Sequence, residues 1–228
     1  MMLATYQDFL DRVDELGFMS LSDLADAMPS LSSETRNTAW HTGDPDTDPW
    51  QWKDRAAEEK RLAYGCILGG AKGFISARMY PLFYAACRPE EWMEERWISG
   101  MISQTTWDLW QLFEAKTTLD TSEIRREMGV TAKSGGSRAD ASTRDLQREF
   151  YITVAGNRRK LDRSGHPHGW PACLYETVTT WAPPEWLAPV DKLDPAAARE
   201  AILDAGMAIA KGLSREELAR ALGLRAIA

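Results

Sequence analysis

The stretch LDTSEIRREMGV, residues 119–130, carries the strongest local signal for the fold. Asp120 or Thr121 can cap a helix, because a short polar side chain accepts a hydrogen bond from the free N–H groups of the first turn. Ile124 falls on the inward face, and Gly129 suits the residue after a helix that turns left-handed. The sequence therefore predicts a short, well-bounded helix in the middle of the chain.

The residues that follow predict a second helix and a pair of strands. We expect, in order, a glycine-bearing turn at 132–137, a helix at 138–150, a strand at 151–156, a long loop at 157–173 and a strand at 174–181. The order helix, turn, helix, strand, loop, strand is that of a winged helix-turn-helix unit, a common DNA-binding module.

A tryptophan-rich segment precedes this unit. Apolar residues at near-helical spacing predict helices between Glu90 and Phe113, with a break near Gly100 and a fresh start at Ser103. The segment holds four of the ten tryptophans, and we expect most of them in the core: Trp92, Trp97, Trp107 and Trp110. With this segment, the second winged-helix unit spans residues 89–188.

The first 88 residues predict a similar order of elements. We expect helices at 3–16, 20–29 and 31–41, strands at 62–68 and 73–76 around a Gly-Gly-Ala-Lys turn, and a helix at 77–87. Three helices followed by a hairpin again match a winged helix. We therefore predict a first winged-helix-like unit over residues 1–88.

The remaining residues, 189–228, predict a pair of helices. Asp194 and Pro195 can start a helix that runs to about Lys211, and Ser214 with Glu217 forms a capping box for a second one. The predicted architecture is therefore mainly α with short β-hairpins: tandem winged helix-turn-helix units plus a C-terminal helical pair.

Charge is distributed unevenly along the chain. The net charge is −7, from 27 Lys plus Arg and 34 Asp plus Glu, which argues against coating of nucleic acid by bulk charge. Residues 123–163, however, hold ten basic and six acidic residues, a local charge of +4 that leaves −11 for the rest. Double-stranded DNA, the partner that the fold predicts, would have to sit against this basic segment.

The arginines of helix 138–150 are the first candidates for that contact. With Leu146 facing inward, Arg144 and Arg148 lie on the opposite face, which a winged helix presents to the major groove. The loop cations could follow the phosphate backbone, and the predicted DNA-binding set is Lys53, Lys133, Arg138, Arg144, Arg148, Arg158, Arg159, Lys160 and Arg163. The alternative is that these are solvated helix charges and a soluble loop.

The segment PWQWKDR, residues 49–55, is the second candidate site. As an alternating strand it would place Trp50, Trp52 and Asp54 on one face and Gln51 and Lys53 on the other. Two tryptophans could then hold a nucleobase by stacking while a polar side chain meets the edge of the base or a water molecule. The alternative is that both tryptophans are packing anchors.

Other chemistries have little support. The three cysteines Cys66, Cys87 and Cys173 are too few and irregular for disulfides or a zinc site, and His166, His168 and Cys173 lack a fourth ligand. The chain contains no phosphate-loop, dinucleotide, zincin or serine-hydrolase motif. It contains neither a secretory signal nor an apolar stretch of membrane-spanning length. We expect no metal, no cofactor, no membrane contact and a cytoplasmic location.

Several segments resemble the AlkZ-related group of winged-helix proteins. They are DPWQWKDR at 48–55, LAYGCILGGAKGFIS at 62–76, YPLFYAA at 80–86 and the region from Leu119 to Leu187. The resemblance implies tandem winged-helix units and a relationship to DNA glycosylases that excise alkylated bases or unhook interstrand crosslinks.

The resemblance also implies catalytic positions. Those glycosylases use a Gln-x-Gln or Gln-x-Asp motif, and the nearest match is Gln51-Trp52-Lys53, with Asp54 one position further on. Gln51 would orient a water molecule, and Asp54 would act as a base or stabilise positive charge on the sugar. The alternative function is a non-enzymatic module, either like a transcription regulator or for protein interaction.

Overall fold

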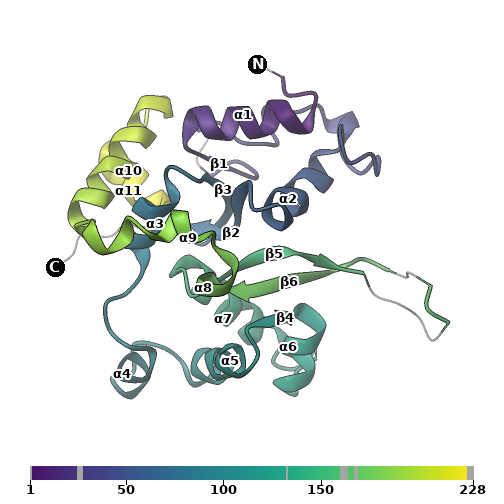
Figure 1. Cartoon of the computed structure of the whole chain (residues 1–228), viewed down its shortest axis with the longest axis vertical. Helices are drawn as coiled ribbons and strands as arrows, with labels where there is room; N and C mark the ends of the chain where they lie inside the picture. The colour runs from purple at the N-terminus through teal and green to yellow at the C-terminus, as the bar shows by residue number, and fades with distance from the viewer. Residues whose placement is uncertain (1, 25–27, 132, 160–163, 167–168, 225–228) are drawn as a thin grey trace.

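Two small antiparallel sheets, each of three strands, form the centre of the computed structural model (Figure 1). The structure describes residues 2–24, 28–131, 133–159, 164–166 and 169–224. Helices surround both sheets, so the fold is mixed α/β, with more residues in helices than in strands. No helix of the described residues is both long enough and apolar enough to cross a membrane.

The first sheet contains the predicted hairpin and one strand that was not predicted. Its strands are β1 (Phe18–Ser20), β2 (Leu62–Leu68) and β3 (Ala71–Ser76), in the order β1-β3-β2. The hairpin prediction at 62–76 is confirmed. β1 escaped prediction because a strand of three residues is too short to show an alternating pattern.

Two helices pack on this sheet, α1 (Tyr6–Leu16) and α2 (Pro49–Glu58). The prediction of α1 is confirmed, and Thr5 caps it with a capping box. The predicted helix at 31–41 is wrong beyond a single 3-10 turn, η1 (Asn37–Ala39). The prediction at 20–29 falls partly on residues 25–27, outside the described residues, and the described remainder is not helical.

Serine side chains explain why these helices do not form. The Ser30 hydroxyl donates to Asp23 Oδ1 at 2.9 Å and accepts from the backbone N–H of Ser33. Ser33 in turn accepts from the backbone N–H of Ser30 at 3.1 Å. Such local bonds satisfy backbone groups that a helix would otherwise use, and so favour a turn.

The segment PWQWKDR is helical, so the prediction of a strand there is wrong. Asp48 accepts a hydrogen bond from Trp50 N at 2.9 Å, and Pro49 occupies the first helical position of α2. An aspartate cap followed by proline is a strong start signal. It outweighs the alternation of tryptophan with polar residues, which is only two pairs long, Trp50-Gln51 and Trp52-Lys53.

The second sheet repeats the order of the first. Its strands are β4 (Thr118–Asp120), β5 (Ile152–Arg158) and β6 (Ala172–Thr177), in the order β4-β6-β5. Its helices are α5 (Gln104–Ala115), α6 (Thr121–Glu127) and α7 (Gly136–Arg148). The predicted helices, the cap by Asp120 and the strand at 151–156 are confirmed. The predicted strand at 174–181 is confirmed only as far as Thr177, because residues 178–181 form a helix.

The remaining helices complete the chain. They are α3 (Tyr80–Cys87), α4 (Met93–Ile98), α8 (Val178–Trp181), α9 (Pro184–Leu187), the 3-10 turn η2 (Val190–Lys192), α10 (Pro195–Ile209) and α11 (Arg215–Ala221). The predicted break near Gly100 and the C-terminal helical pair are confirmed. One hydrophobic cluster joins Phe83, Trp181 and Ile202, so all three predicted units contribute to a single core.

The two sheets meet along β2. Gln147 on α7 accepts a hydrogen bond from Cys66 N at 3.0 Å, and Thr153 on β5 donates to the Tyr64 carbonyl at 3.3 Å. Gly65 is required between these two contacts, because a Cβ there would lie 2.7 Å from the Gln147 Oε1 atom. The adjacent residues Tyr64 and Gly65 thus both contribute to the contact between the sheets, Tyr64 by its carbonyl and Gly65 by the absence of a side chain.

Candidate functional site

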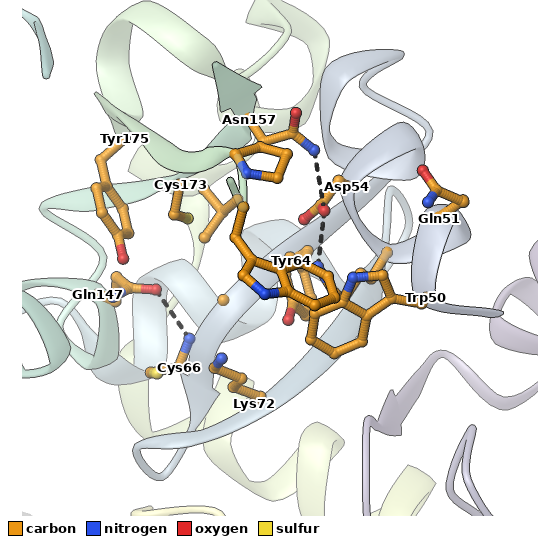
Figure 2. Close-up of a pocket in the computed structure, with 15 residues that line it drawn as sticks. Trp50, Gln51, Asp54, Tyr64, Cys66, Lys72, Gln147, Asn157, Cys173 and Tyr175 are labelled. Carbon is orange, nitrogen blue, oxygen red and sulfur yellow. Dashed lines mark hydrogen bonds and ion pairs between the residues drawn. The ribbon is translucent and has the colours of Figure 1, made fainter. Parts of the chain in front are cut away.

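A pocket of about 320 Å³ lies between the two sheets and is called the inter-sheet pocket below (Figure 2). Its lining comes from both halves of the chain: Trp50, Gln51, Lys53, Asp54, Tyr64, Gly65, Cys66, Lys72, Gln147, Val154, Asn157, Trp170, Pro171, Cys173 and Tyr175. The volume is at the lower end of the range of small-molecule sites, about 300–1,000 Å³.

Asp54 is held at one side of the pocket by two donors. Lys53 Nζ lies 2.7 Å from Asp54 Oδ2, and Asn157 Nδ2 donates to the same oxygen at 3.0 Å. Figure 2 shows Asp54 between Asn157 and Tyr64. Among the described residues no hydrogen bond reaches the other carboxylate oxygen, Oδ1. With respect to the described residues, that oxygen can accept a hydrogen bond from a ligand.

The prediction that Lys53 binds DNA does not fit its position. The side chain is buried, and its ammonium lies 4.2 Å from the Trp50 ring centroid and 5.7 Å from that of Tyr64. Ammonium groups so placed are attracted to the ring faces. Lys53 therefore neutralises Asp54 and fixes the aromatic walls instead of reaching a phosphate.

The two tryptophans of α2 have different positions. Trp52 is fully buried and stacks on Phe9 with ring centroids 5.7 Å apart, so it has no free face for a base, and its proposed stacking role is wrong. Trp50 is half-buried at the pocket. The helix also brings Gln51 and Asp54 to the same pocket, since residues three apart lie on one helix face.

An aromatic rim surrounds the pocket mouth. Trp170, from the β5–β6 loop, is 69% exposed and meets Trp50 edge-on with centroids 6.2 Å apart. His41 lies 4.8 Å from Trp50 and 6.2 Å from Trp170 by the same measure. Three rings from two distant segments thus offer surfaces on which a flat group can stack.

The thiols and phenols of the pocket are held neutral. Burial raises the pKa of Cys173 to about 11, and burial likewise raises the pKa of Cys66. The pKa values of Tyr64 and Tyr175 are also raised by burial, with Asp54 adding to the effect on Tyr64. Neither cysteine is a thiolate nucleophile at neutral pH, because the reactive form is the deprotonated one.

A smaller cavity of about 200 Å³ continues the pocket along α7. It shares Cys66, Lys72, Gln147 and Tyr175 with the inter-sheet pocket and extends to Arg144. Lys72 and Arg144 are exposed, and no described residue forms an ion pair with either. The two cavities together form one groove, with these two cations beside it; it is called the basic groove below.

The other predicted DNA-binding cations are placed less favourably. Arg148 pairs with Asp145 at 3.3 Å and Glu149 at 3.5 Å, and Arg158 pairs with Asp120 at 3.0 Å and Glu123 at 2.9 Å. Three further cations are exposed, namely Lys133, Arg138 and Arg159. Lys160 and Arg163 lie outside the described residues.

The arginine face of α7 is directed toward the first sheet. A Cβ on Gly70, in the β2–β3 turn, would lie 3.7 Å from Arg144 Cδ and 3.9 Å from Arg148 Cδ. The turn therefore lies against this face. The face is exposed at its guanidinium groups but is not open along its whole length to a DNA major groove, as an isolated winged helix would be.

Sequence reasoning missed Tyr64, Lys72, Gln147 and Asn157 as pocket residues. Asn157 meets Asp54 across 103 positions of sequence, and no local pattern reports such a contact. Lys72 had a usable signal, because a lysine in a predicted hairpin turn is usually exposed. The described residues contain no cluster of three or more His, Cys, Asp or Glu that could hold a metal ion.

Comparison with known proteins gives one finding. The sequence model of a family described as AlkZ related matches residues 3–223 of the 228 residues. No curated protein and no solved structure matches the chain.

Proposed function

The chain belongs to the AlkZ-related family, and from this premise we propose that it binds double-stranded DNA along the basic groove. A nucleobase turned out of the duplex would enter the inter-sheet pocket. The observation that carries the proposal is the groove itself, in which two cations without an ion-pair partner among the described residues lie beside a pocket rimmed by aromatic rings.

The topology supports a tandem winged-helix interpretation. Both sheets contain a short strand that precedes a helix and a hairpin, and in both the hairpin's second strand is central. Each sheet unit also has a helix on the N-terminal side of its first strand, α1 in one and α5 in the other. This is the arrangement expected of a helix-turn-helix core with a wing.

Phosphate contacts would come from Lys72 and Arg144. Cations beside a groove neutralise phosphates and release counterions, which makes affinity fall as salt rises. Because the β2–β3 turn lies against α7, the arginine contact is to the backbone of one strand, in place of the major-groove contact expected from α7 alone. Such contacts position the duplex without reading its sequence.

Base capture would use the aromatic rim. Extrusion of a base from the duplex costs a few kcal/mol, and the cost is lowest for a damaged or mispaired base. Stacking of the extruded base between aromatic rings offsets part of this cost. Trp50 and Trp170 are the rings at the mouth. The neutral, buried tyrosines and cysteines beneath them suit an uncharged or alkylated base.

Asp54 extends the proposal to hydrolysis of the N-glycosidic bond. When that bond breaks, its electron pair leaves with the base, and positive charge develops at C1′ and the ring oxygen of the sugar. The free Oδ1 of Asp54 would stabilise this charge and take a proton from the water that attacks C1′. Gln51, at the edge of the same pocket in Figure 2, would orient that water.

DNA binding is tested by a salt titration with labelled duplex. The double variant Lys72→Ala with Arg144→Ala should bind more weakly and show a salt slope shallower by about two phosphate contacts. Lys192→Ala, an exposed cation on η2, is the matched control. Affinity that is independent of salt, or unchanged in the double variant, contradicts the proposal.

Catalysis is tested separately, by release of base from alkylated duplex DNA. Asp54→Asn should abolish release while DNA binding is kept, and Asp191→Asn is the matched exposed control. Circular dichroism and thermal unfolding establish that the Asp54 variant is folded.

One observation favours a second candidate, a DNA-binding protein without catalysis. Lys53 already neutralises Asp54 across 2.7 Å, which weakens the field that a developing sugar cation would feel. Wild-type protein that binds duplex with the expected salt dependence but releases no base from any alkylated substrate supports this candidate over the glycosylase.

A further inference from the structure

A second cavity, of about 470 Å³, lies beside α4 and α5 and is independent of the basic groove. Its aromatic lining includes Trp92, Trp107 and Trp110. Trp107 is held in place by stacking on Trp97, with centroids 5.2 Å apart and planes 7° apart, and Trp110 meets Tyr151 edge-on at 5.2 Å. The rings of Trp107 and Trp110 are therefore held in place before any ligand arrives, whereas Trp92 is 78% exposed.

The rim of this cavity carries unpaired negative charge. Glu90, Glu91, Glu94 and Glu114 line it and are exposed, and no described residue forms an ion pair or hydrogen bond with their carboxylates. Arg88 is the cation of the lining, but it is already engaged: its guanidinium lies 3.4 Å from the Tyr151 ring centroid and donates to the Phe150 carbonyl at 2.8 Å.

We propose that this cavity binds an arginine side chain from a basic segment of a partner protein. A guanidinium stacks on aromatic rings and meets carboxylates with two parallel hydrogen bonds, so it matches both parts of the lining. Arg88 on Tyr151 shows the same stacking within the cavity wall. Four rim carboxylates give the charge complementarity that selects a basic segment.

Exposed apolar groups next to the cavity fit a protein partner. Trp92 is 78% exposed, and Ile98 and Met101, at the end of α4 and in the turn after it, are 72% and 62% exposed. Clustered exposed apolar side chains rimmed by charge mark interaction sites. Helix α4 also lies on the side of the molecule away from the β5–β6 loop (Figure 1), so a partner there leaves the basic groove free.

The test measures, by fluorescence anisotropy, how tightly the full chain binds a labelled peptide of alternating arginine and glycine. We expect Trp92→Ala to weaken binding about tenfold, with Trp92→Phe restoring part of the affinity. Glu94→Gln and Glu114→Gln should each weaken it about two- to fivefold, while Glu216→Gln, an exposed carboxylate on α11, should not.

A peptide with citrulline in place of arginine separates charge from shape, since citrulline is uncharged and nearly the same size. It should bind at least about tenfold more weakly than the arginine peptide. Equal binding of the two peptides, or wild-type affinity in both Trp92→Ala and the glutamate variants, overturns the proposal. Because neither readout uses DNA, the outcome is independent of the proposed function.

Discussion

The two sheet units share a topology but use the helix before the hairpin in opposite ways. In the first unit α2 buries Trp52 in the core and directs Asp54 into the inter-sheet pocket. In the second unit α7 buries Leu146, directs Arg144 outward and inserts Gln147 against the first unit. Both units line the pocket, and each contributes one cation beside it, Lys72 from the first and Arg144 from the second, so the site exists only where the two meet.

The same contrast explains the distribution of charge. Residues 1–52 hold ten acidic and two basic residues, whereas residues 123–163 carry a local charge of +4. The DNA strand proposed above would therefore be attracted by the charge of residues 123–163 and repelled by that of residues 1–52. The net charge of −7 averages over this difference.

The largest effect should come from the buried tryptophan of α2. Trp52→Ala should lower the free energy of unfolding by about 3–5 kcal/mol, because it leaves a large cavity in the core. Trp50→Ala, two residues away at the pocket mouth, should cost less than about 1 kcal/mol. Urea unfolding measures both, and equal losses would contradict the assignment of one ring to the core and the other to the site.

The conservative variant Trp52→Phe tests the role of Trp52 in the core more finely. The indole N–H of Trp52 is buried and has no hydrogen-bond partner among the described residues. Trp52→Phe therefore gives up packing but no hydrogen bond, and it should cost clearly less than Trp52→Ala.

The contact between the units is tested next. Gly65→Ala should lower the free energy of unfolding by about 1–3 kcal/mol, since the new methyl would lie 2.7 Å from Gln147 Oε1. In a double-mutant cycle with Gln147→Ala the two losses should not add, because the shorter side chain removes the clash. Strict additivity would show that Gly65 is needed for another reason.

The two arginines of α7 should differ in DNA affinity. Arg144→Ala should weaken binding to duplex by about tenfold, as Arg144 has no ion-pair partner among the described residues. Arg148→Ala should have a smaller effect, because Asp145 and Glu149 already offset its charge. Fluorescence anisotropy at two salt concentrations measures both, and a larger loss for Arg148 would refute this order.

The smallest expected effect concerns Cys173 and alkaline pH. Burial raises its pKa to about 11 in the folded protein from an ordinary value of 9.0, so between these values the unfolded chain loses the proton while the folded chain keeps it. The wild-type protein therefore loses stability as pH rises through this window. Relative to Cys173→Ser, this loss should be about 1 kcal/mol or less between about pH 8 and pH 9.5, by urea unfolding.

Local signals predicted most of the secondary structure. The cap at Asp120, the capping box at Ser214 and the apolar strands β2 and β5 depend on residues within one element, and all were confirmed. The errors arose where two local signals conflicted. At PWQWKDR the Asp48 cap favoured a helix and the alternation favoured a strand, and the helix formed. Near Ser30 the apolar spacing favoured a helix, but side-chain hydrogen bonds to the backbone stabilise a turn instead.

The candidate site was predictable only in part. Gln51, Asp54 and Trp50 could be selected from the sequence because aromatic and polar residues are concentrated there. Their true arrangement depends on α2 being a helix, which turns Trp52 inward and brings Gln51 and Asp54 to one face. Asn157 and Lys72 could not be paired with them by any rule of spacing.

The amino-acid sequence by itself determined the helices, the hairpins, the family and the basic character of residues 123–163, because each depends on neighbours in the chain or on composition. The tertiary structure alone decided which side chains share a pocket. The hydrogen bond from Asn157 to Asp54 joins residues 103 positions apart and forms only when one sheet packs against the other. The same packing brings the β2–β3 turn against Arg144. Burial and contacts between distant segments are set by that packing, and no local pattern encodes them.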